Sequence, residues 1–314
     1  MLRSVPAACA AALAALIAIG FLLPEWAMFL TTMAFAKGLV ALGLVCLMRA
    51  GLVSFGQGLY FCVGAYVSGL MANWTGISDI FLLSVLGILA AGIVAAIFGP
   101  LLATYRGIFF AMLTLSLSMI LYGTLSKMTV LGGTDGLNVA APTFLGYAPE
   151  GRALGFALYL FTCVVVVVTG GLTRVFFNSE HGLIALAIRD NELRVEYLGA
   201  SVRTEIAVSY AVAAVLAGIG GVIAGLAIGH VDPEFSYWTT SGEFVFVAIL
   251  SGYFSIGAVF ISSILLELVR SFSNLYFPNT WQLSLGIFLL VVILLLPNGL
   301  GSLLSKLKRK ERRT

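Results

Sequence analysis

Charged side chains are scarce in this sequence of 314 residues, because Asp, Glu, Lys and Arg together make up only 10% of it. A soluble globular domain carries about 25% charged residues, which keep its surface solvated. With 61% hydrophobic residues and a mean hydropathy of +1.08, the composition excludes a water-soluble enzyme and a disordered chain. The net charge of +3 is also too small to indicate a surface that binds nucleic acid.

Residues that carry chemistry are equally few. The chain has 2 His and 4 Cys, and each Cys lies in an apolar run, as expected of a small core hydrophobe rather than of a disulfide framework. The sequence contains no HExxH, GxSxG, CxxC or Walker A pattern. A membrane-embedded enzyme is therefore disfavoured, and we expect no catalytic residue, metal site or cofactor in this chain.

What the sequence has in abundance is long apolar runs. A helix needs about 20 such residues to cross the hydrocarbon layer of a bilayer. We expect an all-α polytopic membrane protein, a single transmembrane domain over residues 1–314 with ten spans. The predicted spans are 7–23, 28–48, 51–71, 80–103, 107–126, 154–173, 205–228, 238–252, 256–276 and 281–297.

Lys and Arg predict the orientation of these spans, because positively charged loops remain cytoplasmic. With both termini inside, 13 of the 17 Lys and Arg residues fall on the inner side, six of them in a basic tail within 298–314. The first run follows Arg3 and could alternatively be a cleaved signal peptide. The topology of the remaining spans would be the same.

Ten spans divide into two halves of five, which would enter the membrane in opposite senses, as in many transporters built from inverted repeats. The third span of each half is interrupted by glycine, and such broken helices often line a midplane pathway. We predict pathway roles for Ser54, Gly56, Gln57 and Gly58, whose polar groups need a protein-lined or wet surrounding. Helix packing is the better interpretation of Gly64 and Gly69.

Four charged residues lie in or near the spans, where an unpaired charge is costly. Glu267 and Arg270 are three residues apart and are predicted to pair on one helix. Lys37 is predicted to extend to the headgroups. Glu243 has no cation near it in the sequence, so either a pathway role or a cap on the short eighth span is open.

Two of the loops that connect the predicted spans are long, one on each side of the membrane. The outer loop, 128–153, contains a GGTDG turn motif at Gly132, Gly133, Thr134, Asp135 and Gly136. The inner loop, 174–204, is predicted to form a short amphipathic helix, with Leu183, Leu186, Ala187, Val195 and Leu198 on its apolar side. Because the charges of this helix are nearly balanced, docking of a protein partner is favoured over a helix that rests on lipid headgroups.

Four segments give the chain a resemblance to a known family. They are GLVSFGQGLYFCVGAY (51–66), YRGIFFAMLTLSLSMIL (105–121), LGGTDGL (131–137), and the stretch from GLIALAIRDNELRVEYLGASVR at 182 to VDPEF at 231–235. In this order they resemble the Liv-type permeases, the membrane subunits of ATP-binding-cassette importers for branched-chain amino acids. That group also includes importers of urea and short amides.

The resemblance implies a permease of the bacterial inner membrane that pairs with a second permease subunit, either a homologous chain or a copy of itself. It also implies two cytoplasmic ATPases that bind ATP, and a periplasmic or surface-anchored binding protein that delivers the substrate. The ATPases would dock on a coupling segment at about 182–199. Its residues in this sequence are Gly182, Ala187, Ile188, Arg189, Asp190, Asn191 and Glu192.

Two departures from the family pattern affect the predicted pathway. Gln57 stands where family members often have His, and Leu250 to Phe254 replace a glycine-rich stretch. Branched-chain amino acids remain the expected substrate, with urea, short amides or another small organic solute as the alternative. A secondary carrier or channel that needs no ATPase, with Glu243 or Lys37 coupling an ion, is a second alternative.

Overall fold

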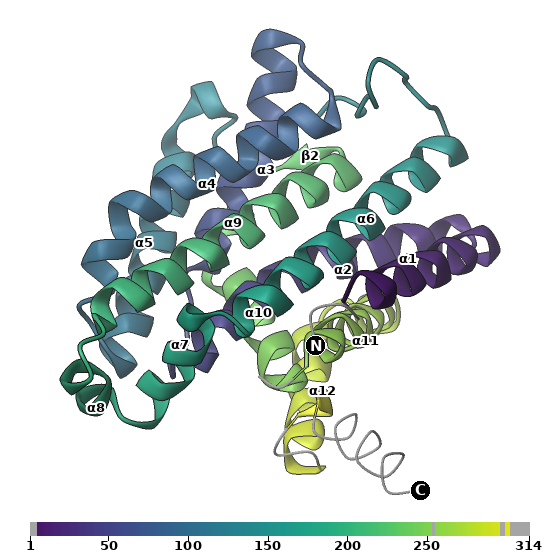
Figure 1. Cartoon of the computed structure of the whole chain (residues 1–314). Helices are drawn as coiled ribbons and strands as arrows, with labels where there is room; N and C mark the ends of the chain where they lie inside the picture. The colour runs from purple at the N-terminus through teal and green to yellow at the C-terminus, as the bar shows by residue number, and fades with distance from the viewer. Residues whose placement is uncertain (1–4, 253–254, 296–298, 302–314) are drawn as a thin grey trace, which may run out of the picture.

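The computed structural model describes residues 5–252, 255–295 and 299–301, and within them the chain is almost entirely helical (Figure 1). Arg3, Tyr253, Phe254 and all six basic residues of the tail lie outside the described residues. The α-helices are α1 Val5–Leu22, α2 Glu25–Arg49, α3 Gln57–Thr75, α4 Ile80–Leu102, α5 Gly107–Lys127, α6 Arg152–Phe177, α7 Glu180–Asp190, α8 Glu192–Tyr197, α9 Val202–Ile228, α10 Trp238–Ser251, α11 Ile256–Tyr276 and α12 Trp281–Leu295.

Each of the ten apolar segments predicted from the sequence overlaps one of these helices. Six of the described helices, α2, α4, α5, α6, α9 and α11, are long and apolar enough to cross a membrane. The chain is therefore an all-α membrane protein. Its core lies around α2 and α9. The side chains of these two helices are mostly apolar on every side and are largely buried, as expected of helices surrounded by other helices.

The outer helices surround this central pair. Helix α9 packs against α2, α3 and α4, whereas α2 also packs against α10 and α11. In Figure 1, α4, α9, α6 and α1 lie side by side. Gly64 of α3 meets α9 so closely that a Cβ atom there would lie 2.0 Å from the carbonyl oxygen of Gly218, which confirms the packing interpretation of Gly64.

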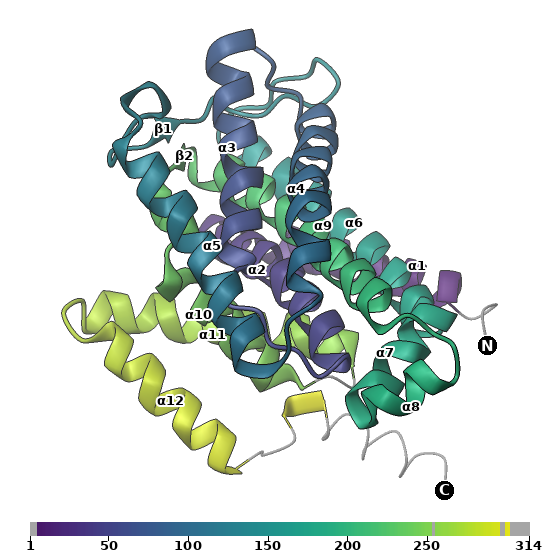
Figure 2. The ribbon, with the colours of Figure 1, turned by 90° about the vertical axis from the view of Figure 1, so that its left-hand side faces the viewer.

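A small sheet lies at one end of the bundle, and the short helices α7 and α8 lie at the other (Figures 1 and 2). Strands β1 (Leu137–Asn138) and β2 (His230–Val231) pair antiparallel, with Leu137 opposite Val231. They join the loop after α5 to the loop before α10. Two 3₁₀ helices, η2 (Thr129–Leu131) and η3 (Pro233–Ser236), flank this sheet in the chain.

The third predicted span was wrong at its start. Residues 51–56 are not helical, and α3 begins only at Gln57. Gly51 has a φ of +77°, which ends the preceding helix, and the backbone N–H groups of Phe55 and Gly56 donate to the hydroxyls of Thr114 and Ser54. Ser54 and Gly56 therefore lie in a non-helical segment that leads into α3, whereas Gln57 and Gly58 begin its first turn.

Candidate functional sites

The N-termini of α3 and α10 meet inside the bundle. The backbone N–H of Gly58, the second residue of α3, donates to Oγ of Ser241 on α10 at 3.1 Å. Close by, the hydroxyl of Ser118 on α5 donates to the carbonyl of Ser236, just before α10, at 2.7 Å. Both interrupted helices predicted from the sequence thus begin at one place, although the serines of α5 and α10 were not predicted to belong to it.

Gln57 is the unusual residue of this meeting point. Its side chain is fully buried, at 0% exposure, and neither Nε2 nor Oε1 has a hydrogen-bond partner among the described residues. A buried polar group without a partner costs about 1–3 kcal/mol, so native proteins retain few of them without a functional reason. Ser54 and Gly56, which precede Gln57 in the chain, are buried as well. The backbone N–H of Gly56 donates a hydrogen bond to Oγ of Ser54 at 3.2 Å.

Glu243 lies on a different face of α10 from Ser241. Its Oε2 accepts from Nη1 of Arg270 on α11 at 3.0 Å and lies 3.4 Å from Nζ of Lys37 on α2. Lys37 also donates to Oε2 of Glu267 on α11 at 2.8 Å. These four residues form a neutral ion network that links α2, α10 and α11.

This network corrects three sequence predictions. Lys37 does not extend to the headgroups, because it sits midway along α2 with 5% exposure. Glu267 and Arg270 each bond to a residue of another helix instead of to each other. Glu243 does not cap α10, which begins five residues earlier at Trp238. Periodicity along one helix could not reveal partners that come from elsewhere in the chain.

The inner loop folds into two helices rather than one. Asn191 breaks the predicted segment: its extended backbone ends α7, and its side chain caps α8 by accepting from the N–H of Arg194 at 2.9 Å. The buried side chains are Ala185, Ile188 and Val195, together with Gly182. Of the predicted apolar side, Val195 is buried and Leu186 partly buried, but the prediction was wrong for Leu183, Ala187 and Leu198, which are exposed.

The exposed surface of α7 and α8 is partly apolar. Leu183, Leu193, Tyr197 and Leu198 are 57%, 65%, 90% and 81% exposed. We call these four residues the α7–α8 patch. Arg189 and Asp190, which were predicted to contact a partner, are exposed as well, together with Ala187 and Asn191. Apolar side chains exposed beside charges are typical of a surface that binds another protein.

Several contacts hold α7 and α8 against the bundle. His181 Nδ1 lies 2.8 Å from Oε2 of Glu205 on α9. Arg106, the residue before α5, donates from Nη2 to Oε1 of Glu192 at 2.7 Å. The backbone of Gly51 lies against Arg189, so that a Cβ atom on Gly51 would be 3.4 Å from Cγ of Arg189. The end of α7 thus touches the non-helical segment that leads to Gln57.

The GGTDG motif is a tight turn at the opposite end. Gly132, Gly133 and Gly136 have φ values of +88°, +57° and +73°, which residues other than glycine rarely adopt. A Cβ atom on Gly136 would lie 2.2 Å from the carbonyl oxygen of Val231. The hydroxyl of Thr134 donates to Asp135 at 3.3 Å. This geometry gives the motif a structural role, since it docks the outer loop onto the segment before α10.

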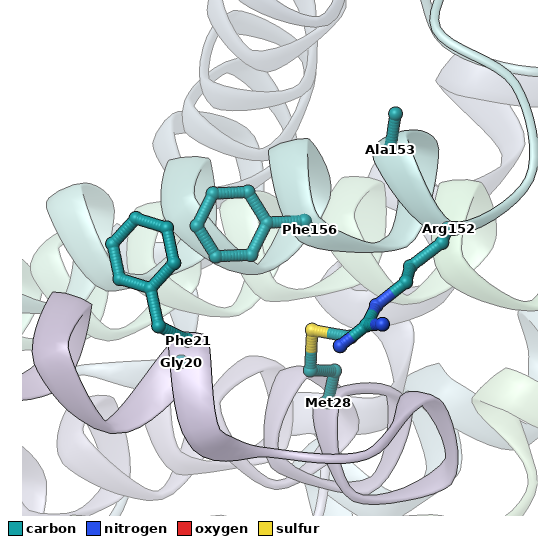
Figure 3. Close-up of a pocket in the computed structure, with 6 residues that line it drawn as sticks. All are labelled: Gly20, Phe21, Met28, Arg152, Ala153 and Phe156. Carbon is teal, nitrogen blue, oxygen red and sulfur yellow. The ribbon is translucent and has the colours of Figure 1, made fainter.

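A small pocket opens between α1, α2 and α6 at the end of the bundle where α6 begins (Figure 3). It measures about 360 Å³, and Phe21, Met28 and Phe156 are its large apolar lining residues. In Figure 3, Arg152 extends over the pocket towards Met28. With one polar side chain among its lining residues, this pocket offers no set of groups that could orient a polar solute.

Comparison with known proteins identifies the family of the chain. A family model described as "Branched-chain amino acid transport system / permease component" matches residues 26–296. The high-affinity branched-chain amino acid transport system permease protein LivM of Escherichia coli is 26% identical over 279 residues, which cover 80% of this chain. The alignment covers 64% of the length of that LivM protein, so the chain spans less than two thirds of it.

Two further relatives bear similar names. The LivM permease protein of Salmonella typhimurium is 25% identical, over 89% of this chain and 71% of the relative. The LivH permease protein of the same organism is 24% identical, over 80% of this chain and 85% of the relative. No solved structure matches the chain. Because the family model covers most of the sequence, the chain belongs to the family of branched-chain amino acid transport system permease components.

Proposed function

We propose that the chain is the translocation subunit of an ATP-driven importer of branched-chain amino acids. It would span the inner membrane ten times, with both termini in the cytoplasm, and work beside a second permease subunit. Two cytoplasmic ATPases would bind and hydrolyse the ATP, a binding protein would deliver the substrate, and this chain would hold no cofactor. The names of the LivM and LivH relatives support the transport of branched-chain amino acids.

The arrangement of the helices supports two inverted halves, α1 to α5 and α6 with α9 to α12. In such a pair, α9 corresponds to α2, and each should pack against the third and fourth spans of the other half. Helix α9 packs against α3 and α4, and α2 packs against α10 and α11. This reciprocal packing is what a two-fold relation between the halves requires.

The distribution of charge supports the orientation. Among the described residues, Arg49, Arg106, Arg174 and the three arginines of 189–203 lie towards the end of the bundle that carries α7 and α8. Lys127 and Arg152 lie at the opposite end. By the positive-inside rule, α7 and α8 would face the cytoplasm.

One contact carries the mechanism: Arg189 of α7 against Gly51. An ATPase bound to the α7–α8 patch would move α7, and Gly51 would pass this motion to the non-helical segment 51–56 and to Gln57 at the start of α3. The buried amide of Gln57 would then gain partners, from water or from the substrate, when the meeting point of α3 and α10 opens. A ligand can drive such a change only by its differential affinity for the two states.

Charge reversal at two exposed positions tests the docking role. The double variant Arg189→Glu/Asp190→Arg keeps the net charge and should insert normally, but ATP-driven uptake and copurification of the ATPase should both be lost. Glu150→Arg/Arg152→Glu, at two exposed positions at the opposite end of the bundle, is the matched control for a change of surface charge and should keep its ATPase. If Arg189→Glu/Asp190→Arg retains uptake and its ATPase, α7 is not the docking site.

A further inference from the structure

A second and larger groove is lined by residues of α1, α6 and α11. Figure 1 shows where these three helices lie in the bundle. The groove has a volume of about 790 Å³ and is closed at its base by α2. Leu16, Val166, Phe260 and Ile264 are among the apolar side chains along its walls. It lies on another side of the chain from Gln57 and from the meeting point of α3 and α10, none of whose residues lines it.

Glycines keep this groove open. A Cβ atom on Gly257 of α11 would meet nothing within 4 Å, and one on Gly170 of α6 would come no closer than 3.5 Å to Ile256. Larger side chains at these two positions would therefore fit the backbone but would project into the groove. Small residues at its walls therefore help to keep the hollow open.

One end of the groove is positively charged. Arg49, at the end of α2, and Arg174, in the last turn of α6, both line it, whereas no Asp or Glu does. The guanidinium of Arg49 lies over the ring of Phe177 at 4.1 Å, and its Nε is buried without a hydrogen-bond partner among the described residues. Neither arginine forms an ion pair with a described carboxylate.

A ligand that fits this groove needs an anionic group at one end and a long apolar part along the rest. Guanidinium groups bind phosphate oxygens through paired, charge-assisted hydrogen bonds. Basic pockets between membrane helices bind the headgroups of anionic lipids in the same way. A protein segment could fill the groove only if it placed an acidic side chain at the two arginines and were apolar along the rest. A phospholipid has both features, an anionic phosphate at one end and a long apolar chain.

We propose that the groove binds one anionic phospholipid, with its phosphate between Arg49 and Arg174 and an acyl chain along α6 and α11. This site requires only that the chain lies in a membrane. The proposed orientation adds one point, that the lipid comes from the cytoplasmic leaflet. Arg174 lies six residues before α7 in the chain. A bound lipid would therefore hold the end of α6, from which α7 follows.

The experiment measures bound lipid directly. The full chain, purified in detergent and exchanged into mixed micelles with phosphatidylglycerol or with phosphatidylcholine, is analysed by native mass spectrometry. We expect one phosphatidylglycerol per chain and little phosphatidylcholine. In Arg49→Gln/Arg174→Gln, retention of phosphatidylglycerol should fall roughly tenfold, since two charge-assisted contacts are lost. Lys127→Gln/Arg194→Gln removes the same charge from exposed positions outside the groove and should retain the lipid.

A second pair of variants tests the apolar part while leaving both arginines in place. Gly257→Leu fills the groove and should also lose the lipid, whereas Gly123→Leu on α5, where a Cβ atom likewise meets nothing within 4 Å, should not. Equal retention by wild type and Arg49→Gln/Arg174→Gln would overturn the proposal. So would a purified wild-type chain that holds a second copy on this face instead of lipid, or that binds inorganic phosphate as tightly as phosphatidylglycerol. Failure of these tests leaves the importer assignment intact, because Arg189→Glu/Asp190→Arg examines that assignment separately.

Discussion

Replacement of Gln57 by leucine should make the chain more stable and less active. The side chain is fully buried and both its polar atoms lack partners among the described residues. Each unsatisfied group costs about 1–3 kcal/mol, and leucine has a similar size without polar atoms. We therefore expect Gln57→Leu to raise the free energy of unfolding by about 1–3 kcal/mol, the cost of one such group, since relaxation around the shorter leucine offsets part of the gain.

The assay has two readouts. Thermal unfolding of the purified chain in detergent should shift upwards by roughly 2 °C or more, while ATP-driven uptake of leucine by cells with the assembled importer should fall. The opposite signs distinguish a functional residue from one that only packs, because a packing residue would lose both properties together. Gln282→Leu is the matched control: Gln282 is exposed, so its replacement relieves no buried amide and should leave the unfolding temperature nearly unchanged.

Two results would refute the reasoning about Gln57. A lower unfolding temperature in Gln57→Leu would mean that the amide forms hydrogen bonds in the resting chain. Normal uptake at a raised unfolding temperature would mean that the amide is not needed on the pathway. In the second case the meeting point of α3 and α10 would be a structural junction, and the pathway would have to be sought between this chain and its partner subunit.

Two further predictions concern stability. Lys37→Met leaves the carboxylate of Glu267 without its cation in the bundle and should destabilise the chain by about 3–5 kcal/mol, whereas Lys37→Met/Glu267→Gln should recover much of the loss; equal unfolding temperatures of the two variants would contradict the ion network. Gly64→Ala would place a methyl group 2.0 Å from the carbonyl oxygen of Gly218 and should lower stability by about 1–3 kcal/mol. Gly123→Ala, which meets nothing within 4 Å, should be neutral or slightly stabilising by the same thermal measurement, and a similar loss in both variants would refute the packing argument.

The sequence by itself determined that this is a helical membrane protein, because apolar runs of sufficient length have few other stable states. It also located most of the spans to within a few residues, although not the start of α3, and singled out the glycine-rich segment around Gln57. These properties are local, since they depend on the hydropathy and the backbone preferences of neighbouring residues. The family resemblance followed from the same short segments.

The tertiary structure decided which residues meet. Lys37 pairs with Glu243 and Glu267, more than 200 residues away in the chain, and no helical period predicts such a contact. The buried face of α7 and α8 likewise depended on where Asn191 ends one helix and begins the next. Partners of this kind are chosen by the packing of whole helices, which is a property of the folded chain and not of any segment within it.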